Sequence, residues 1–546
     1  MNVTQSNDAN DSGSHFKRTD AVFFAAAAFF IYTQLFEFPF TPIYFDGDQL
    51  IPISNALRML DGEVIYRDFF HFAPPGTELV YAAFFSVFGV KIWVVNFLIL
   101  LLSVTQVWLL WFFSRQLLSG VAVYLPSLVF LTIGFRQMGI DGSYRLFSVV
   151  FVLGAVAVLF KGRTTRNILV AGALCGLASF FVQPRGAVGV AGIALFLAWE
   201  NYTDNFDLRK LAKCGIALIA SFSIIVILTQ TYFAWQGGFG NYYFDIVTFL
   251  HKHYPHDPLN NQFAYFSDVP GFAKYLEAQS PLSALSRFIR TAFPVVFYYA
   301  LIPLVYLASI FVVWKNGLAD VSRERKHNLM LLTFIGLALA AGVSAPTSAR
   351  FYHVAIPGIV ILVWMIRQFR ITSRFVIPAA AALSILAISY PIQRQIIVKD
   401  YVDFPAGRSA FLIRDDLAKY EWVKANTKSG DTVYDAHHPS FYFPFQLRNP
   451  TPIYLVRDSE YTPAFQIESI VLALEKSPPN LIIWEGTYSK HSETRKPGDN
   501  LEALWQYVSR NYTLRAEFSK DGEYNFQSTR DTEMWVRNAL TTEMHR

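Results

Sequence analysis

The sequence has 546 residues, of which 53% are hydrophobic and only 16% are charged, with a formal net charge of +5. A soluble chain usually carries about 25% charged residues, so this one lacks the polar groups needed to cover a water-facing surface. No cluster of Lys and Arg interleaved with aromatic residues predicts nucleic-acid binding. The two cysteines, Cys175 and Cys214, both lie in apolar segments, which excludes a disulfide framework and favours buried packing roles.

The first two thirds of the chain carry nearly all the long apolar runs. The polar stretch 1–19 precedes the first of them, and that run is too long for the core of a signal peptide. A helix that crosses the hydrocarbon needs about 20 mostly apolar residues. We therefore expect an α-helical polytopic membrane protein with about eleven spans, at 20–40, 91–113, 118–135, 145–160, 167–184, 186–200, 212–235, 291–314, 329–345, 352–368 and 375–392.

One further apolar run, residues 77–90, is short for a span and suits a segment lying on the membrane surface. If it does not cross and the N-terminus is cytoplasmic, nearly every short basic loop falls on the cytoplasmic side, as the positive-inside rule requires. The sequence then predicts a multi-pass protein of the bacterial inner membrane with an extracytoplasmic C-terminal domain. The basic groups concerned are Lys17, Arg18, Arg115, Lys161, Arg163, Arg166, Arg209, Lys210, Lys213, Lys315, Arg323, Arg325, Lys326, Arg367, Arg370 and Arg374.

This topology divides the chain into a cytoplasmic tail (1–19), a transmembrane domain (20–392) and an extracytoplasmic domain (393–546). The short basic turns on the inner side contain no Gly-rich phosphate loop and no nucleotide fingerprint. That argues against a nucleotide-driven pump and against a cytoplasmic enzyme that uses nucleotide sugars. The chemically unusual segments all lie outside, in the loops 41–90, 135–144, 236–290 and 345–352.

The predicted extracytoplasmic domain has the composition of a soluble protein. His437 and His438 begin the loop after its first strand; ordinary loop histidines are the simpler interpretation, and a metal or substrate role is the alternative. Alternating helical and strand patterns predict a small α/β domain. The helical patterns cover 414–426, 466–476 and 501–511, and the strand patterns cover 432–435, 480–484, 514–518 and 524–527.

Two acidic residues, Asp46 and Asp48, emerge just beyond the first predicted span. The apolar residues from 50 to 60 then recur at helical spacing and predict a short amphipathic helix on the membrane surface, which Asp61-Gly62 ends. Carboxylates are costly near the low-dielectric bilayer, so they tend to mark function where they occur. The alternative is an exposed loop whose acids keep it in water.

The whole first loop carries a family resemblance. Asp48, the surface helix ending at Gly62, Tyr66-Arg67-Asp68 and Pro74-Pro75-Gly76 together resemble the first loop of GT-C glycosyltransferases. The pattern is similar to bacterial relatives of protein O-mannosyltransferases and of lipid A aminoarabinose transferases. Arg350-Phe351-Tyr352, followed by Ala355-Ile356-Pro357, resembles the segment that opens a late span in such proteins.

The resemblance implies a hexosyl- or pentosyltransferase that inverts the anomeric carbon. The donor would be a polyprenyl-phosphate sugar in the membrane, and the acceptor a hydroxyl of a glycolipid, polysaccharide or protein. Asp48 would be the general base, a role that typically contributes about 10² to 10⁴-fold in rate. Asp46 could join Asp48 in binding a divalent cation, although two carboxylates are too few to identify a metal. Arg67 and Arg350, assisted by His71, would bind the donor phosphate; lipid anchoring or a salt bridge is the alternative.

Two other outer loops hold candidate residues. GT-C proteins often place a second acid in the next outer loop, where Asp141 could orient the acceptor or complete a metal site; an ion pair with Arg145 one helical turn away is the alternative. In the long loop, His251, His253 and His256 are too closely spaced, with prolines between them, for a shared tetrahedral metal site. We expect that loop to recognise sugar or phosphate.

Three other functions are compatible with a multispanning chain. A lipid-linked sugar transporter or flippase would show broken helices and ionisable groups near the membrane midplane, whereas the charges here crowd the outer loops. An O-antigen ligase or polymerase shares long outer loops, but the pattern from Asp48 to Gly76 favours a glycosyltransferase. A chain that has lost catalysis and whose tail binds a cell-wall partner is the third alternative.

Overall fold

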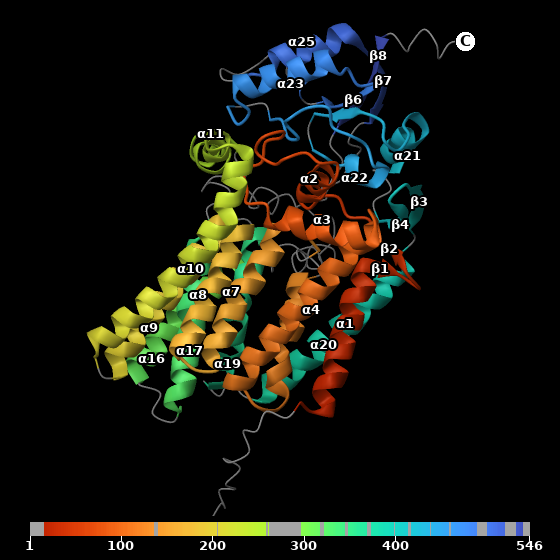
Figure 1. Cartoon of the computed structure of the whole chain (residues 1–546). Helices are drawn as coiled ribbons and strands as arrows, with labels where there is room; N and C mark the ends of the chain where they lie inside the picture. Colours follow the sequence, from red (N-terminus) through yellow and green to blue (C-terminus); the bar gives the residue numbers. More distant parts are fainter. Residues whose placement is uncertain are drawn as a thin grey trace, which may run out of the picture.

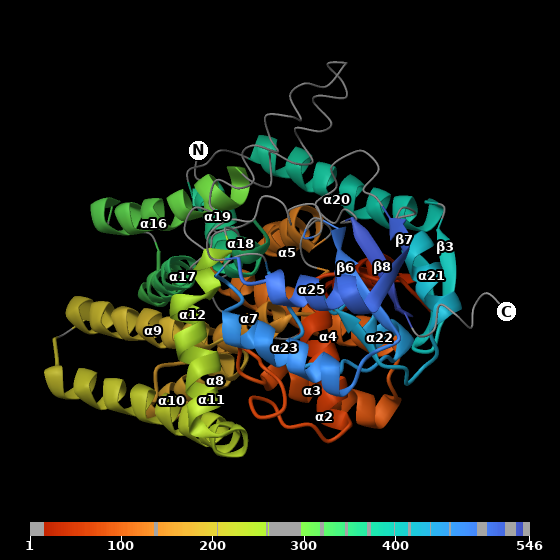
Figure 2. The same cartoon turned by 90° about the horizontal axis from the view of Figure 1, so that it is seen from above.

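The computed structural model describes residues 16–135, 140–204, 206–257, 260, 296–316, 321–343, 348–368, 373–397, 399–412, 417–436, 438–457, 460–486, 488, 499–518 and 531–538. Long helices lie side by side in a bundle, and a smaller domain of strands and helices covers one end of it (Figure 1). Seen from above, that domain covers part of the bundle, and α9, α10 and α16 extend beyond it on one side (Figure 2).

The bundle helices coincide with the predicted apolar segments. The last six residues of the segment 118–135 wind as a π-helix rather than an α-helix, and the segment 352–368 is interrupted at Ala355. The elements are α1 Arg18–Leu35, α4 Ile92–Leu117, η1 Gly120–Tyr124, α5 Leu125–Val129, η2 Phe130–Phe135, α7 Tyr144–Phe160, α8 Thr165–Phe181, α9 Gln183–Asp204, α10 Leu208–Gly237, η8 Phe297–Leu301, α16 Ile302–Asn316, α17 Arg323–Ala341, α18 Ser348–Val354, α19 Ile356–Gln368 and α20 Ser373–Ile396.

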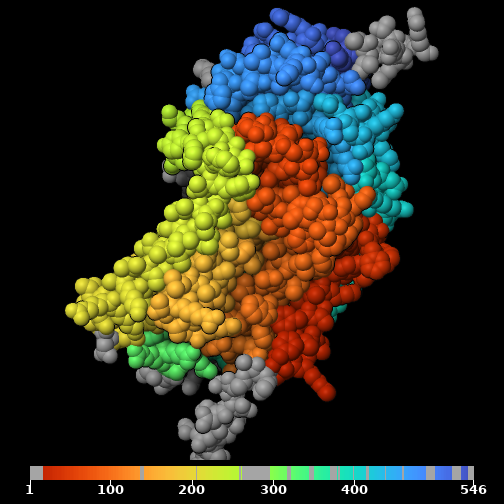
Figure 3. All heavy atoms as spheres, in the orientation of Figure 1, coloured from red at the N-terminus to blue at the C-terminus, as the bar shows by residue number. Residues whose placement is uncertain are grey.

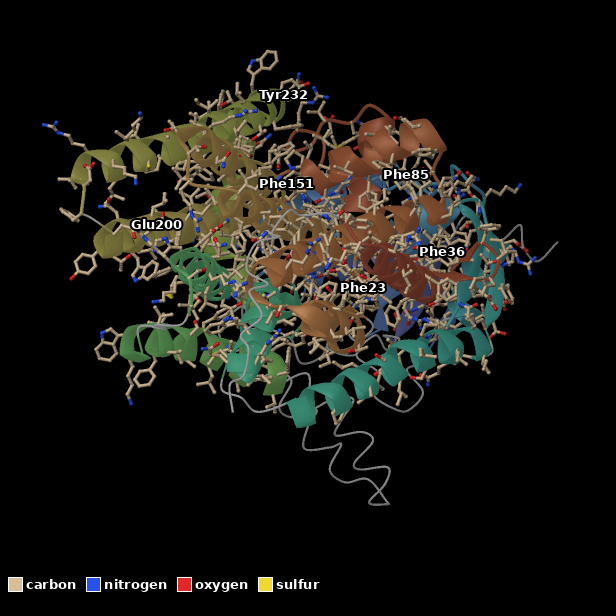
Figure 4. The ribbon with its side chains drawn as sticks, turned by 90° about the horizontal axis from the view of Figure 1, so that it is seen from below. Phe23, Phe36, Phe85, Phe151, Glu200 and Tyr232 are labelled. Carbon is tan, nitrogen blue, oxygen red and sulfur yellow. The ribbon has the colours of Figure 1, made fainter. Side chains whose placement is uncertain are left out.

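Three of these helical stretches in the described part of the chain are long and apolar enough to cross a membrane: α4, α10 and Phe297–Lys315. Only 6% of the most apolar window of α10 is buried inside the protein. Tyr232 stands on its outer flank, whereas Phe151 lies within the bundle (Figure 4). An apolar surface this large and uncovered is typical of a helix that faces lipid.

The first span is shorter than the sequence predicts. Helix α1 ends at Leu35 and not at 40, and the chain then forms an antiparallel ribbon of β1 (Phe36–Glu37) and β2 (Thr41–Pro42). Pro39 explains the difference, because proline disfavours helical backbone in the preceding residue and has no N–H to donate.

Helices α8 and α10 pack closely because of two glycines. A Cβ added to Gly172 would lie 2.4 Å from the carbonyl oxygen of Leu218, and one added to Gly176 would lie 2.7 Å from Ile225 Cβ. Residues four apart share one helix face, so the pair forms the small-residue contact that membrane helices use to approach each other. Cys175, next to this contact, is a buried free thiol, in agreement with the predicted packing role.

Short helices lie at the end of the bundle that the C-terminal domain covers. Helix α3 runs across this end rather than along the bundle (Figure 1). Near its C-terminus Val87 is 72% exposed and Phe88 47% exposed, as expected for the surface-lying segment predicted at 77–90. The elements here are α2 Leu50–Leu60, α3 Gly76–Phe88, α11 Phe239–Tyr243, η3 Phe244–Thr248, α12 Phe249–Lys252 and η4 Tyr254–His256.

The opposite end of the bundle gathers predicted cytoplasmic turns. Glu200, near the end of α9 (Figure 4), lies 2.8 Å from Nδ1 of His327 and 3.4 Å from Nε of Arg163. These contacts bring the turn after α7, the end of α9 and the start of α17 together. The two sets of loops that the charge pattern separates therefore lie at opposite ends of the bundle.

Within its described residues the C-terminal part contains two sheets. The first is the antiparallel hairpin β3–β4, and the second is a four-stranded sheet in the order β5-β6-β8-β7, in which only β5 and β6 run parallel. Strand β8 lies between β6 and β7. The sequence patterns predict neither β8 nor the hairpin strands β3 and β4. The predicted strand 524–527 lies outside the described residues. The elements are β3 Asp400–Phe404, β4 Gly407–Phe411, α21 Leu417–Asn426, β5 Val433–Asp435, α22 Tyr442–Phe445, α23 Ala464–Lys476, β6 Leu481–Glu485, α25 Glu502–Asn511, β7 Tyr512–Phe518 and β8 Thr532–Arg537.

Candidate functional site

An arginine joins the acids of the first two outer loops. Arg145, in the first turn of α7, donates from Nη2 to Asp48 Oδ2 at 2.8 Å and from Nη1 to Asp141 Oδ2 at 3.2 Å. Its side chain is only 9% exposed, whereas that of Asp48 is 51% exposed and that of Asp141 23%. The predicted pairing of Asp141 with Arg145 is therefore present, and the same guanidinium also holds Asp48.

The backbone around these acids is fixed by side chains from neighbouring elements. Gln49 accepts from the Gly142 N–H through Oε1 at 2.8 Å, and the Tyr81 hydroxyl of α3 donates to the Gly142 carbonyl at 2.7 Å. A Cβ on Gly142 would lie 2.3 Å from the Tyr81 oxygen, so only glycine fits there. These contacts hold the first loop, the second loop and α3 in one arrangement.

The electrostatics separate the two acids. Burial raises the pKa of Asp48, but the Arg145 guanidinium outweighs it and brings that pKa down to about 2, with smaller contributions from His438 and Arg350. Burial raises the pKa of Asp141 above its ordinary value, and the Asp48 charge adds to this, although Arg145 opposes both. Asp48 is therefore an anion at any physiological pH, whereas Asp141 holds a proton more readily.

The two acids also differ in which oxygens are accessible. Both Asp141 oxygens accept from Ser143, one from its N–H at 3.1 Å and the other from its hydroxyl at 2.6 Å. Asp48 Oδ1, in contrast, makes no hydrogen bond within the part of the chain that the structure describes. Asp48 thus has an exposed oxygen that makes no hydrogen bond within the described residues, whereas both oxygens of Asp141 are engaged.

Asp46 contacts the C-terminal domain, whereas Asp48 pairs with Arg145 of the bundle. The Ser440 hydroxyl lies 3.1 Å from both of its carboxylate oxygens, and the Tyr420 hydroxyl donates to Oδ2 at 3.4 Å. His438 Nδ1 lies 3.8 Å from Asp46 Oδ1, and its charge contributes to lowering the pKa of Asp48. An ordinary loop histidine is the simpler interpretation of His438 from the sequence, but the fold places its ring beside the Asp46 carboxylate. His437 lies outside the described residues.

The described side chains alone do not build a cation site at Asp46 and Asp48. No three His, Cys, Asp or Glu side chains among them converge as metal ligands. The guanidinium beside Asp48 would also repel a cation bound there. A metal at this pair stays a prediction, and no step proposed below is routed through one.

The charge of Arg350 also contributes to lowering the pKa of Asp48. Its Nη2 donates to Asn260 Oδ1 at 2.8 Å and lies 3.5 Å from the Tyr254 hydroxyl. The predicted phosphate-binding arginine of the late span therefore contacts the long outer loop. Tyr254 lies within the histidine cluster in the sequence, and Asn260 follows it closely.

The other two predicted phosphate ligands occupy different surroundings. Arg67 is half exposed and makes a bidentate pair with its neighbour Asp68, at 2.9 and 2.7 Å. His71 is buried, with Nε2 2.8 Å from Glu78 Oε1 and its backbone N–H donating to Asp245. Among the described residues neither side chain makes an ion pair with Asp48 or Asp141.

The histidines of the long loop do not converge. His253 Nδ1 lies 2.9 Å from the Glu460 carbonyl oxygen, and His256 Nε2 lies 3.1 Å from the Glu460 carboxylate, while His251 is exposed. Two of the three therefore attach the loop to the C-terminal domain. Recognition of sugar or phosphate by this loop stays a prediction.

Comparisons with known proteins agree with this architecture. Residues 73–232 match the family described as dolichyl-phosphate-mannose-protein mannosyltransferase. This segment contains Asp141 and Arg145, but neither Asp48 nor Arg350. No curated protein sequence matches the chain.

Solved structures share the fold at low sequence identity. The apo oligosaccharyltransferase of Archaeoglobus fulgidus superposes with a TM-score of 0.52 at 11% identity, covering 94% of this chain and 74% of that one. Its complex with Zn and sulfate gives 0.52 at 12% identity, covering 94% and 73%. ArnT from Cupriavidus metallidurans bound to undecaprenyl phosphate gives 0.45 at 11% identity, covering 94% and 97%.

The family match over residues 73–232 and the shared fold support the GT-C superfamily of glycosyltransferases. They agree with the resemblance noted in the first loop, although Asp48 and the residues up to Phe72 lie outside the matched segment.

Proposed function

We propose that the protein transfers a hexose or pentose from a polyprenyl-phosphate donor to an acceptor hydroxyl at the outer face of the bacterial inner membrane. The observation that carries the proposal is the half-exposed Asp48, which pairs with Arg145 and whose pKa the charges of Arg145 and Arg350 both lower. The match to a family named for dolichyl-phosphate-mannose supports a lipid-phosphate donor. The acceptor would belong to a glycolipid, a polysaccharide or a protein.

The proposed reaction is a single inverting displacement. The acceptor oxygen forms a bond to the anomeric carbon while the bond from that carbon to the phosphate oxygen breaks. The acceptor proton passes to Asp48 Oδ1, and the lipid phosphate leaves with its charge compensated by Arg350. A carboxylate with a pKa of about 2 is a weak base, so proton transfer is expected late, when the attacking oxygen has become acidic.

The direct test is transfer in proteoliposomes that contain the purified protein and defined polyprenyl-phosphate sugars. Acceptors of the three classes are offered in turn, and the products are identified by mass spectrometry. A sugar-specific product that requires the protein supports the proposal. Movement of the donor between leaflets without any transfer would identify a flippase instead and would overturn it.

The phosphate site is tested with Arg350→Ala and Arg67→Ala. Loss of a charge-assisted hydrogen bond costs about 1.5–3 kcal/mol, so we expect KM for the donor to rise roughly 10- to 100-fold in Arg350→Ala. Arg350→Lys should recover part of the loss, because it keeps the charge but not the two-pronged geometry. Arg67 is the second predicted phosphate ligand, so Arg67→Ala should also raise the donor KM. An unchanged donor KM in both alanine variants would show that these arginines do not bind the donor phosphate.

The topology belongs to the same proposal: eleven spans, a cytoplasmic N-terminus and an outer C-terminal domain. Single cysteines at Arg323 and Arg325, in a chain without Cys175 and Cys214, should resist a membrane-impermeant maleimide in intact spheroplasts. A cysteine at the exposed Ser477 should react under the same conditions. Labelling in the reverse pattern would invert the topology and place the acids in the cytoplasm.

A further inference from the structure

Arg185 is a buried arginine for which the described residues supply no acidic partner. It lies in the first turn of α9 and is 9% exposed. Within the described residues its side chain makes no ion pair, and its side-chain hydrogen bonds go to two oxygens of α7. A buried charge is costly unless it is paired or hydrogen-bonded, so such a guanidinium needs a role that uses its charge or its donors.

The guanidinium of Arg185 holds the start of α7. Its Nη1 donates to the Arg145 carbonyl oxygen at 2.8 Å and to the Ser148 hydroxyl oxygen at 2.9 Å. The Ser148 hydroxyl donates to the same carbonyl at 3.2 Å. The backbone of Arg145 is therefore held from the α9 side, while its own guanidinium donates to the two acids, Asp48 and Asp141.

Two glycines bring α9 close enough for this contact. A Cβ on Gly186 would lie 2.0 Å from the Cys175 carbonyl oxygen of α8, and one on Gly189 would lie 3.3 Å from Val152 Cγ1 of α7. Helices α7, α8 and α9 accordingly lie side by side (Figure 1). The start of α9 is packed directly against both neighbours, so the Arg185 side chain reaches α7 from a fixed backbone.

The acids that Arg145 contacts lie where the bundle meets the C-terminal domain. In the space-filling view the first loop, in red and orange, contacts the blue C-terminal domain above it (Figure 3). From the domain side, Ser440 contacts Asp46, two residues before Asp48. From the bundle side, Asp48 accepts from Arg145. The position of Asp48 over the bundle therefore depends on how firmly the Arg145 backbone is held.

We propose that Arg185 is a positioning residue for transfer, which fixes the first turn of α7 so that the Arg145 guanidinium stays between the two acids. It acts through Arg145, without contact with donor or acceptor. Repulsion between the two guanidinium charges adds to the effect, because it disfavours movement of the Arg145 side chain away from the acids and toward α9. The role in catalysis rests on the proposed function, whereas the positioning of Arg145 does not.

The electrostatic neighbours of Arg185 and of Asp48 come from several elements. Those of Arg185 are Tyr144 and Arg145 of α7 and His353 of α18. Those of Asp48 are Arg145, Asp141, His438, Arg350 and Tyr254. Arg145 belongs to both sets and is hydrogen-bonded to both residues. A change in the titration of Asp48 that follows replacement of Arg185 therefore reports on Arg145.

The first test compares Arg185→Gln with the wild type in proteoliposomes that contain a polyprenyl-phosphate sugar. We expect kcat to fall roughly 10- to 100-fold with the donor KM unchanged, because the acids are no longer held in register. A misplaced Arg145 also lowers the pKa of Asp48 less, so the acid limb of kcat/KM should move to higher pH. Arg185→Lys keeps the charge and should recover part of both. Arg209→Gln, exposed in the first turn of α10, is the matched control.

A double-mutant cycle separates positioning from a general loss of structure. In the Arg145→Gln background, Arg185→Gln should cause little further loss, because the residue through which it acts has already been changed. Additive losses would show that Arg185 acts independently of Arg145. A raised donor KM with unchanged kcat would assign Arg185 to the donor phosphate. Either result overturns the proposal.

Carboxyl labelling provides a readout that needs no transfer. A water-soluble carbodiimide reacts with the protonated carboxyl, and the side chain of Asp48 is 51% exposed. Mass spectrometry between about pH 4 and 7 should detect labelling of Asp48 that begins at a higher pH in Arg185→Gln than in the wild type. Equal labelling overturns the positioning role, whereas shifted labelling in a protein whose wild type transfers no sugar refutes only the proposed function. If Arg185→Gln does not fold, Ser148→Ala removes one of the two acceptors of Arg185, and wild-type labelling in that variant overturns the proposal.

Discussion

Replacing Asp48 with Asn is expected to reduce transfer by about 10² to 10⁴-fold while leaving the donor KM nearly unchanged. The amide has the shape of the carboxylate but cannot accept the acceptor proton, and its oxygen can still receive the Arg145 hydrogen bond. The loss should therefore fall on kcat. Proteoliposomes with a radiolabelled polyprenyl-phosphate sugar give both constants, and thermal unfolding in detergent reports on the fold.

Asp403→Asn is the matched control, because Asp403 is an exposed carboxylate on β3 in the same extra-membrane region. Its activity should equal that of the wild type. If Asp48→Asn transfers sugar at the wild-type rate, Asp48 is not the base, and the assignment passes to Asp141, whose raised pKa makes it the stronger base. An Asp141→Asn variant would then show the larger defect.

Replacing Arg145 with Gln should shift the pH dependence of catalysis. In the wild type the guanidinium brings the pKa of Asp48 down to about 2 against the effect of burial. Without the guanidinium the pKa of Asp48 must rise. Because the base works only when it is deprotonated, activity in the variant should begin to fall at a higher pH than in the wild type. The acid limb of kcat/KM, measured between about pH 3 and 8, should move upward.

The same variant should also lose activity at neutral pH, roughly 10²-fold, since Asp48 and Asp141 would no longer be held in register and misplacement of about 1 Å can cost that much. Arg145→Lys should restore the acid limb in part but not the full rate, because a single ammonium cannot bridge both carboxylates as the guanidinium does. Arg166→Gln, exposed at the opposite end of the bundle, is the control. An acid limb that stays in place would show that Arg145 does not govern Asp48.

Local patterns in the sequence predict much of this structure. The helix at 50–60 follows from the helical spacing of its apolar residues. The pairing of Asp141 with Arg145 joins residues only four positions apart, at the start of α7. The contact of Arg145 with Asp48 is different: the residues are 97 positions apart, and only the packing of α7 against the first loop brings them together. No spacing rule relates such residues in a single sequence.

The C-terminal contributions were the least predictable. Strand β8 has a mixed pattern because both of its faces are covered, and the short β3–β4 hairpin becomes stable only by adding to the first loop, where Ile43 pairs with Ala410. The contact of Asp46 with Ser440 depends on the same docking. Single-sequence reasoning places these residues in separate domains.

The attachment of Asp46 to Ser440 has a consequence for biosynthesis. The two residues are separated by 394 positions. At a translation rate of about 5–20 residues per second, roughly 20–80 s pass between the emergence of the acid and that of the serine that holds it. During this interval the outer loops are in the membrane without the domain that orders them. Asp46 therefore lacks its Ser440 contact until the C-terminal domain has been synthesised.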